Sequence, residues 1–253
     1  MISIVICSIT PAKLSAVKSN LSSLLGDEAH EFVAIHDAKS LAEGYNRGVA
    51  KSRGEILILC HDDIEILAKD FRERLLFRLR HYDLLGVAGS RRLAGPQWVS
   101  AGPPHIFGQV AHVDRADNSY DVYVWSAPAP CVGGIRVMDG LFLAGQREVF
   151  EQIPFDDATF DGFHLYDVDF TFRAAKAGFE LAVCLDLMVI HASSGHFDER
   201  WRQYAERFVR KHHGQFASDP PHGWQGMRVK VASKERLPEI LRSPDWRDWR
   251  ETG

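Results

Sequence analysis

The first ninety residues alternate between short apolar runs and segments with helical spacing. Runs rich in Ile and Val predict strands at residues 2–9, 32–35, 55–60 and 84–88. Apolar residues at helical spacing predict helices at 14–25 and 67–82, and a further helix between Ser40, a suitable N-cap residue, and Gly54, a suitable stop. The nearly continuous apolar character of the first run is typical of a strand buried on both faces of a parallel sheet. This order predicts a βαβ beginning.

The pattern changes after residue 90. Residues 91–137 are rich in Gly, Pro, Trp and Val and include short alternating pieces such as 120–125, which predicts loops and antiparallel hairpins. The elements expected next are a strand at 138–144, helices at 147–152 and 167–177, a strand or strand pair at 180–190, and a helix at 198–213. Beyond residue 218 the pattern predicts no element.

These elements predict one α/β domain with an appendage. Its core would be a mostly parallel, Rossmann-like central sheet flanked by helices, with a small antiparallel, loop-rich region beside it. A chain of 253 residues is long enough for one substantial core. We expect the domain to cover residues 1–217 and a C-terminal extension to cover 218–253.

The composition narrows the function classes. A net charge of −4 argues against a nucleic-acid binder, which would normally carry a basic excess. The four cysteines form no CxxC pair, which favours a reducing, cytoplasmic location. No apolar stretch approaches the eighteen or so residues of a membrane span, so we expect no transmembrane segment. Peripheral attachment at the inner face of a membrane stays an alternative.

The sequence His61-Asp62-Asp63 directly follows the predicted third strand. Ligands of open α/β sheets bind outside the carboxyl ends of the strands, so this position is a candidate site. Adjacent carboxylates there could hold Mg²⁺ or Mn²⁺ together with substrate phosphates. The alternative is that Asp62 or Asp63 only caps the following helix.

A second acidic cluster comes at the predicted start of the 167–177 helix. The helix dipole favours the ionised forms of Asp167 and Asp169, and either carboxylate could serve as a general base. Arg173 lies one turn after Asp169, so helix capping with an i,i+4 ion pair is the structural alternative.

Other polar and aromatic residues are weaker candidates. His191 follows an apolar strand and offers an imidazole ligand, although such a histidine is often structural. The pair Asp139-Gly140 would allow a sugar or phosphate to approach the backbone, or would form a simple turn. Trp98 and Trp125 could stack on sugar rings, or anchor their loops.

Taken in order, three segments resemble a known family. These are SLAEGYNRGVAKSRGEILILCHDDIEI, VMDGLFLAGQREVFEQIPFDD and FDGFHLYDVDFTFRAAKAGFELAVCLDLMVIHASSGHF. They resemble the inverting, family-two-like GT-A glycosyltransferases, and especially a small branch with H-x-D and F-H-x-Y-D-x-D motifs. The resemblance implies a GT-A fold, with a nucleotide-binding half at 1–90 and an acceptor-binding half at 91–217.

The resemblance also implies roles for the acidic clusters and the histidine. Asp63 would bind the metal ion, Mn²⁺ or Mg²⁺, on the donor diphosphate, with Asp62 nearby and His61 in place of the usual first acid. His191 would complete the metal site or contact the diphosphate. Asp167 would be the general base, with Asp169 in reserve.

The remaining implied roles concern the substrates. The base and ribose of the donor would contact Ser8, Thr10, Asp37, Tyr45 and Asn46. Apart from the resemblance, we also expect the donor or its nucleotide to contact His61, Asp62, Asp139 and Gly140. The resemblance implies an NDP-sugar-dependent hexosyltransferase in glycan biosynthesis. Its donor would be a UDP- or GDP-sugar, and its acceptor a glycan, a lipid-linked molecule or a protein.

Two other functions stay open. A sugar-phosphate nucleotidyltransferase would use a related sheet, but it would normally carry a Gly-rich, basic loop at residues 8–13. The other hypothesis is a catalytically inactive domain that binds a glycan or nucleotide. The helix at 198–213, with basic and aromatic residues, could touch a membrane, or could pack its aromatic side inward.

Overall fold

The fold is seen in a computed structural model that describes residues 1–125, 129–193, 195, 197–218 and 226–241. The first half begins as the pattern predicts, with alternating strands and helices. These elements are β1 (Ile2–Cys7), α1 (Pro11–Leu25), β2 (His30–Ile35), α2 (Leu41–Lys51) and β3 (Ile56–Cys60). Both β2 and β3 pair with β1 in parallel. The βαβ beginning is therefore confirmed.

The ends of α2 are only partly as expected. Ser40 caps the helix, because its side chain accepts a hydrogen bond from the Glu43 amide at 3.0 Å. The helix stops at Ser52, however, and not at Gly54. Gly54 instead lies against strand β1, where an added Cβ would be 2.6 Å from the Ser3 nitrogen. Its lack of a side chain serves close backbone packing.

A mixed seven-stranded sheet forms the centre of the described chain, in the order β2-β1-β3-β11-β5-β12-β9. Its later strands are β5 (Leu84–Gly86), β9 (Cys131–Ile135), β11 (Phe142–Gln146) and β12 (Leu181–Cys184). Strands β2, β1, β3, β5 and β12 run in one direction, while β11 and β9 oppose them. The sheet is mostly parallel in direction, with reversed strands in its middle and at one edge.

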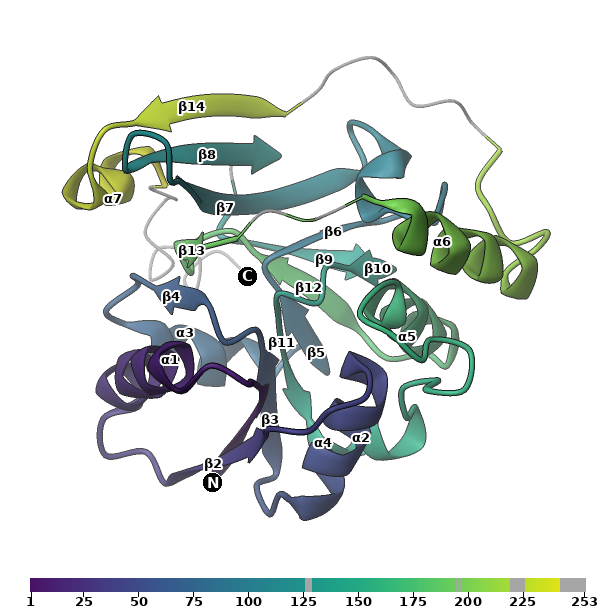
Figure 1. The fold of residues 1–253 in the computed structure, drawn as a ribbon, viewed down its shortest axis with the longest axis horizontal. Helices are drawn as coiled ribbons and strands as arrows, with labels where there is room; N and C mark the ends of the chain where they lie inside the picture. The colour runs from purple at the N-terminus through teal and green to yellow at the C-terminus, as the bar shows by residue number, and fades with distance from the viewer. Residues whose placement is uncertain (126–128, 194, 196, 219–225, 242–253) are drawn as a thin grey trace.

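Helices cover both faces of this sheet. Figure 1 shows α1 and α3 (Phe71–Arg78) on one side, and α2, α4 (Arg147–Gln152) and α5 (Tyr166–Lys176) on the other. Each face buries its own apolar cluster, which explains the continuous apolar runs of the central strands. None of the described helices is both long and apolar enough to cross a bilayer.

A second sheet has the order β10-β6-β7-β13-β4, with β8 on β7 and β14 on β8. Its strands are β4 (Ile64–Ile66), β6 (Ala88–Ser90), β7 (Ile106–Asp114), β8 (Ser119–Trp125), β10 (Val137–Met138), β13 (Val189–His191) and β14 (Met227–Val231). The antiparallel β7–β8 pair confirms the expected hairpin in 91–137. A short 3₁₀ turn, Trp98–Ala101, precedes it.

Three expectations near this sheet are wrong. The strand expected at 138–144 is two strands, β10 in this sheet and β11 in the central one. The helix expected at 67–82 is shorter and covers only Phe71–Arg78, because the Leu67 and Ala68 amides donate to the Met188 and Leu187 carbonyls and so continue the extended path of β4. The strand expected at 84–88 is two strands, β5 and β6, and the chain passes from one sheet to the other at Val87.

Two elements near the C-terminus, β14 and the short helix α7 (Leu237–Ile240), were not expected from the pattern. Helix α6 (Glu199–Lys211) is where the spacing predicts it, but β14 and α7 lie in the proposed C-terminal extension. Strand β14 pairs with β8, and α7 contributes Leu237 to a small apolar cluster under that hairpin. The division at residue 218 stays a prediction. The described part of the C-terminal extension adds a strand to the second sheet.

Candidate active site

A cluster of three metal-ligating side chains lies where β3, β4 and β13 meet. His61, Asp63 and His191 each offer one ligand atom, and these atoms all lie within 4.8 Å of one another. Strand β4 pairs with β13 in antiparallel register, so that His191 is opposite Ile64, and the Ala192 amide donates to the Asp63 carbonyl at 2.9 Å. The next element after the acidic pair is therefore a strand, which excludes simple helix capping.

Charge and burial prepare this cluster for a cation. Burial opposes ionisation of Asp63, but a contact of 3.2 Å to His191 Nε2 and the ammonium of Lys13 at 3.3 Å bring its pKa below the usual range. Burial, and secondly the charge of His191, lower the pKa of His61. A neutral imidazole is the form that binds metals, so these groups fit a divalent transition metal.

Asp62 points to the end of β1. Its carboxylate accepts a hydrogen bond from Ser8 Oγ at 2.6 Å, and the Thr10 amide donates to the same Ser8 oxygen at 3.2 Å. Lys13, in the first turn of α1, lies 3.7 Å from Asp62. The structure thus brings Ser8, Asp62 and Asp63 around a lysine that the sequence analysis missed. Its position just after the first strand was the available signal.

Asp167 lies in the first turn of α5, beside the turn between β10 and β11. The Gly140 amide donates to its Oδ2 at 2.7 Å, and an added Cβ on Gly140 would be 2.7 Å from the Asp167 Cβ. Asp139 accepts from the Leu141 amide and from Trp98 Nε1 at 3.0 and 3.1 Å. Burial, and then the charge of Asp139, raise the pKa of Asp167 to about 7, although the Gly140 bond opposes them.

Tyr166 links this carboxylate to the metal-ligating cluster. Its hydroxyl lies 3.2 Å from His61 Nε2, one residue before Asp167 in the chain. The residue before it, Leu165, has a left-handed φ of 63° at the start of α5. A bulky residue adopts this conformation only where the surroundings hold it, and such strain is common at functional sites.

Aromatic rings continue from the cluster along the second sheet. The His191 ring lies 5.4 Å from His61 and 5.3 Å from His112, its neighbour on β7. On β8, Tyr123 is 5.6 Å from His112 and Trp125 is 5.4 Å from Tyr123; Trp125 lies 5.0 Å from Trp98, which binds Asp139. This series, the aromatic wall, includes His112 and Tyr123, which no motif had marked.

Other candidates lie elsewhere. Asp169 is fully buried and faces the end of α6, where its carboxylate contacts Lys211 and His212 at 2.6 and 2.8 Å; within α5 it contacts Arg173 at 2.8 Å. Burial alone would raise its pKa, but these contacts lower it. A carboxylate held by three donors cannot reach an acceptor, so the reserve assignment as a base is dropped. Arg173 has a structural role, as the ion-pair partner of Asp169.

The residues expected near the nucleotide base are dispersed. Asp37 is exposed and pairs with Arg47 at 2.9 Å. Asn46 exchanges two hydrogen bonds with the Phe155 backbone, at 2.8 and 2.9 Å. Tyr45 is fully buried, with its ring 5.8 Å from that of Tyr166. Tyr45 and Asn46 thus contact residues of the protein, Tyr166 and Phe155, in the packing next to the site.

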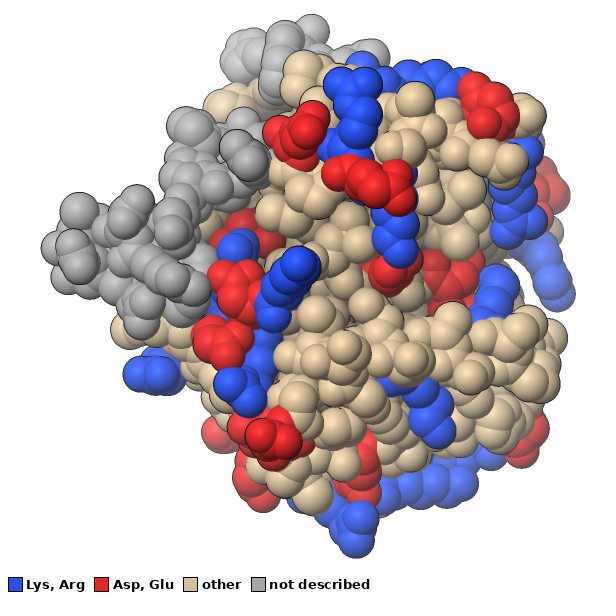
Figure 2. Space-filling view, turned by 90° about the vertical axis from the view of Figure 1, so that its left-hand side faces the viewer, with Lys and Arg blue, Asp and Glu red and all other residues tan. Residues whose placement is uncertain are grey.

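The aromatic side of α6 packs inward. Phe208 is fully buried, and Tyr204 and Arg207 both bond to the Asp161 carboxylate, at 3.0 and 2.7 Å. Figure 2 views the molecule from the side of α1, opposite to α6, and shows basic and acidic side chains interspersed on that face. Membrane contact through α6 stays a proposal.

The two-sheet α/β fold and the histidine–carboxylate cluster define a protein of the glycosyltransferase class. The Glycosyltransferase like family matches residues 3–212, and the chain belongs to this family. No curated protein matches the sequence.

Solved structures show the same fold at low sequence identity. The mannosyltransferase PcManGT from Pyrobaculum calidifontis, in complex with GDP-Man and Mn²⁺, is 12% identical with a TM-score of 0.51. The likeness covers 87% of this chain, which spans 65% of that one. A variant of Drosophila β1,4-galactosyltransferase 7, with manganese, UDP-Gal and xylobiose, is 13% identical with a TM-score of 0.46, covering 96% of this chain and 80% of that one. The likeness to the mannosyltransferase, a GT-A glycosyltransferase, confirms the expected fold class.

Proposed function

We propose that the protein is a metal-dependent inverting glycosyltransferase, which moves a sugar from a nucleotide-diphosphate sugar to an acceptor hydroxyl. The observation that carries the proposal is the placement of His61, Asp63 and His191 beside Asp167, with Tyr166 between them. Cation ligands and a perturbed carboxylate at one site are what a transfer between a diphosphate and a hydroxyl requires.

The donor diphosphate would bind at the metal-ligating cluster. His61, Asp63 and His191 would hold the ion, which would stabilise the charge that builds on the departing diphosphate. The two imidazoles favour Mn²⁺ over Mg²⁺, because Mg²⁺ prefers oxygen ligands. Lys13 lies on the same side and can contact phosphate oxygens directly. The known ligands of the two similar structures, GDP-Man and UDP-Gal, support a nucleotide-sugar donor.

Asp167 would be the general base. As the acceptor oxygen bonds to the anomeric carbon, the bond from that carbon to the diphosphate oxygen breaks, and the diphosphate keeps the electron pair. The acceptor proton passes to Asp167, whose pKa of about 7 suits a base that works near neutral pH. Attack from the side opposite the diphosphate inverts the anomeric centre.

The acceptor would lie against the aromatic wall. Tyr123 and Trp125 are half-buried, and their rings stack at an angle of 13°. Half-buried aromatic rings beside a polar site are suited to pack against sugar rings. The wall lies within the expected acceptor-binding half, and this supports a glycan acceptor, free or attached to a lipid or protein. We also propose that the transfer reaction takes place in the cytoplasm. For a lipid-linked acceptor it would take place at the membrane surface.

The test is release of free nucleotide from a panel of UDP- and GDP-sugars, with and without Mn²⁺. We expect release to require the metal, and to be lost in Asp63→Ala and Asp167→Asn. The exposed Asp27→Asn is a matched control that should keep it. Turnover that persists in both site variants would overturn the mechanism. Pyrophosphate release from a nucleoside triphosphate would indicate a nucleotidyltransferase.

A further inference from the structure

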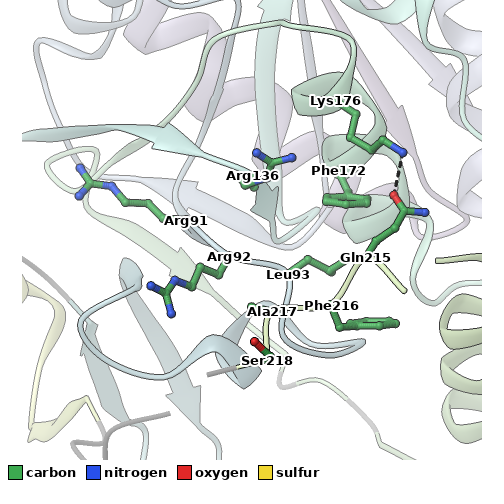
Figure 3. Close-up of a pocket in the computed structure, with 10 residues that line it drawn as sticks. All are labelled: Arg91, Arg92, Leu93, Arg136, Phe172, Lys176, Gln215, Phe216, Ala217 and Ser218. Atoms are coloured by element: carbon green, nitrogen blue, oxygen red, sulfur yellow. Dashed lines mark hydrogen bonds between the residues drawn. The ribbon is translucent and has the colours of Figure 1, made fainter. Parts of the chain in front are cut away.

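A basic cavity of about 410 Å³ lies at the C-terminal end of α5 (Figure 3). Four cationic side chains line it. Arg91 and Arg92 follow β6, Arg136 precedes β10, and Lys176 is the last residue of α5. The lining contains no Asp or Glu.

Three of these cations, Arg91, Arg136 and Lys176, have neutral partners. Arg91 donates to the Gly133 carbonyl at 3.1 Å, and Lys176 donates to the Gln215 side chain at 2.7 Å. The Arg136 guanidinium and the Lys176 ammonium lie 5.7 and 5.9 Å from the centre of the Phe172 ring, and Figure 3 shows both beside it. Among the described residues, Arg91, Arg136 and Lys176 form no ion pair with a carboxylate.

Some other exposed arginines do pair with carboxylates. Arg53 pairs with Glu31 and Arg228 with Asp121, each at 2.7 Å. The whole chain has a net charge of −4, so a local group of four positive charges is not a consequence of a basic composition. Arg91, Arg136 and Lys176, which form no ion pair with a described carboxylate, line one cavity and produce a positive potential that attracts an anion.

The cavity is separate from the candidate active site. Asp167 lies in the first turn of α5 and Lys176 at its last residue, so the two are separated by about 14 Å along the helix axis at 1.5 Å per residue. The two sites are nevertheless connected by one rigid helix and by β10, which runs from the residue after Arg136 to the residue before Asp139.

We infer that this cavity binds a phosphate-bearing ligand. Guanidinium groups hold phosphate oxygens through paired hydrogen bonds, and a lysine adds a point charge. The volume lies within the range of small-molecule sites, so it admits a phosphate carried on a small organic group. A soluble phosphate ester and a phospholipid headgroup share this chemistry. The inference is independent of the proposed transfer reaction.

The test measures binding of glycerol 3-phosphate and pyrophosphate by calorimetry, and of vesicles containing phosphatidic acid by sedimentation. EDTA is present throughout, so that no divalent ion binds probe at the metal-ligating cluster. We expect the wild-type protein to bind at least one probe, with affinity that falls as salt is added. The double variant Arg136→Ala/Lys176→Ala should bind at least tenfold more weakly. Both side chains are exposed, so the fold should be kept, as an unchanged Tm would show.

Two controls make the result decisive. Arg202→Ala/Arg210→Ala removes the same charge from the exposed side of α6 and should bind as the wild type does. Asp63→Ala/His191→Ala should also keep binding, because the metal-ligating cluster is elsewhere. Binding of soluble esters indicates a free ligand, and binding of vesicles alone indicates a headgroup. No binding of any probe, unchanged binding in the cavity variant, or equal loss in the α6 variant would overturn the inference.

Discussion

The ionisation of Asp167 provides a sharp test of the proposed mechanism. Burial and the neighbouring Asp139 raise the pKa of this carboxyl from 3.8 to about 7, which corresponds to about 4 kcal/mol in favour of its protonated form. Replacing Asp139 with Asn removes the second cause and leaves the first. We therefore expect Asp139→Asn to lower the pKa of Asp167 by about one unit.

The first assay is the pH dependence of kcat/KM for sugar transfer. A general base works only when ionised, so kcat/KM should fall tenfold for each pH unit below about 7 and be level above it. In Asp139→Asn the same limb should move to lower pH, whatever happens to the maximal rate. Asp167→Asn should lose about 10² to 10⁴ in kcat.

The second assay measures stability and does not depend on activity. The folded pKa of Asp167 is raised, so its contribution to stability is fully present below about pH 4 and is lost as the pH rises to about 7. Asp167→Asn cannot ionise. Its free energy of unfolding in urea should therefore exceed that of the wild type at pH 8, by at most about 4 kcal/mol, and match it near pH 4.

Each assay can refute a different step. A level kcat/KM between pH 5.5 and 8 would mean that the base is not a group with a pKa near 7. An acid limb that stays in place in Asp139→Asn would mean that Asp139 does not act on it. Parallel stability curves for wild type and Asp167→Asn would show that the pKa of this carboxyl is not raised in the fold.

Three further predictions concern other parts of the site. Mn²⁺ should raise the Tm of the wild type in a thermal-shift assay and have little effect on Asp63→Ala or His61→Ala; an equal rise in all three would place the metal elsewhere. Gly140→Ala should lower kcat on the order of a hundredfold, because its new Cβ would displace Asp167, and full activity would contradict that contact. Asp169→Asn should lower the free energy of unfolding by about 3 kcal/mol in urea, because it removes the buried charge that pairs with Arg173 and Lys211, while Mn²⁺ binding persists. A loss below about 0.5 kcal/mol would contradict the last prediction.

Local pattern was sufficient for most of the first half. The strand and helix periods around Ile2–Cys7 and Pro11–Leu25 depend only on nearby residues, and the structure confirms them. The short strand at Ile64–Ile66 was missed because its partners are distant in the sequence: it pairs with β13, and the Asn20 side chain bonds to Ile66. A periodic pattern contains no information about such a distant partner.

Distant partners also determine how the candidate site is assembled, and the sequence pattern does not show them. At the carboxyl ends of strands in one sheet, Asp63 and His191 would meet only if both strands ran the same way. They meet instead because β4 turns back after the acidic pair and pairs in antiparallel register with β13, in a different sheet. Asp167 and Asp169 show the converse: both stand at one helix start, but residues two apart on a helix point in different directions. Asp167 therefore faces Gly140 while Asp169 faces Lys211 and His212, and only this packing separates the candidate base from a structural ion pair.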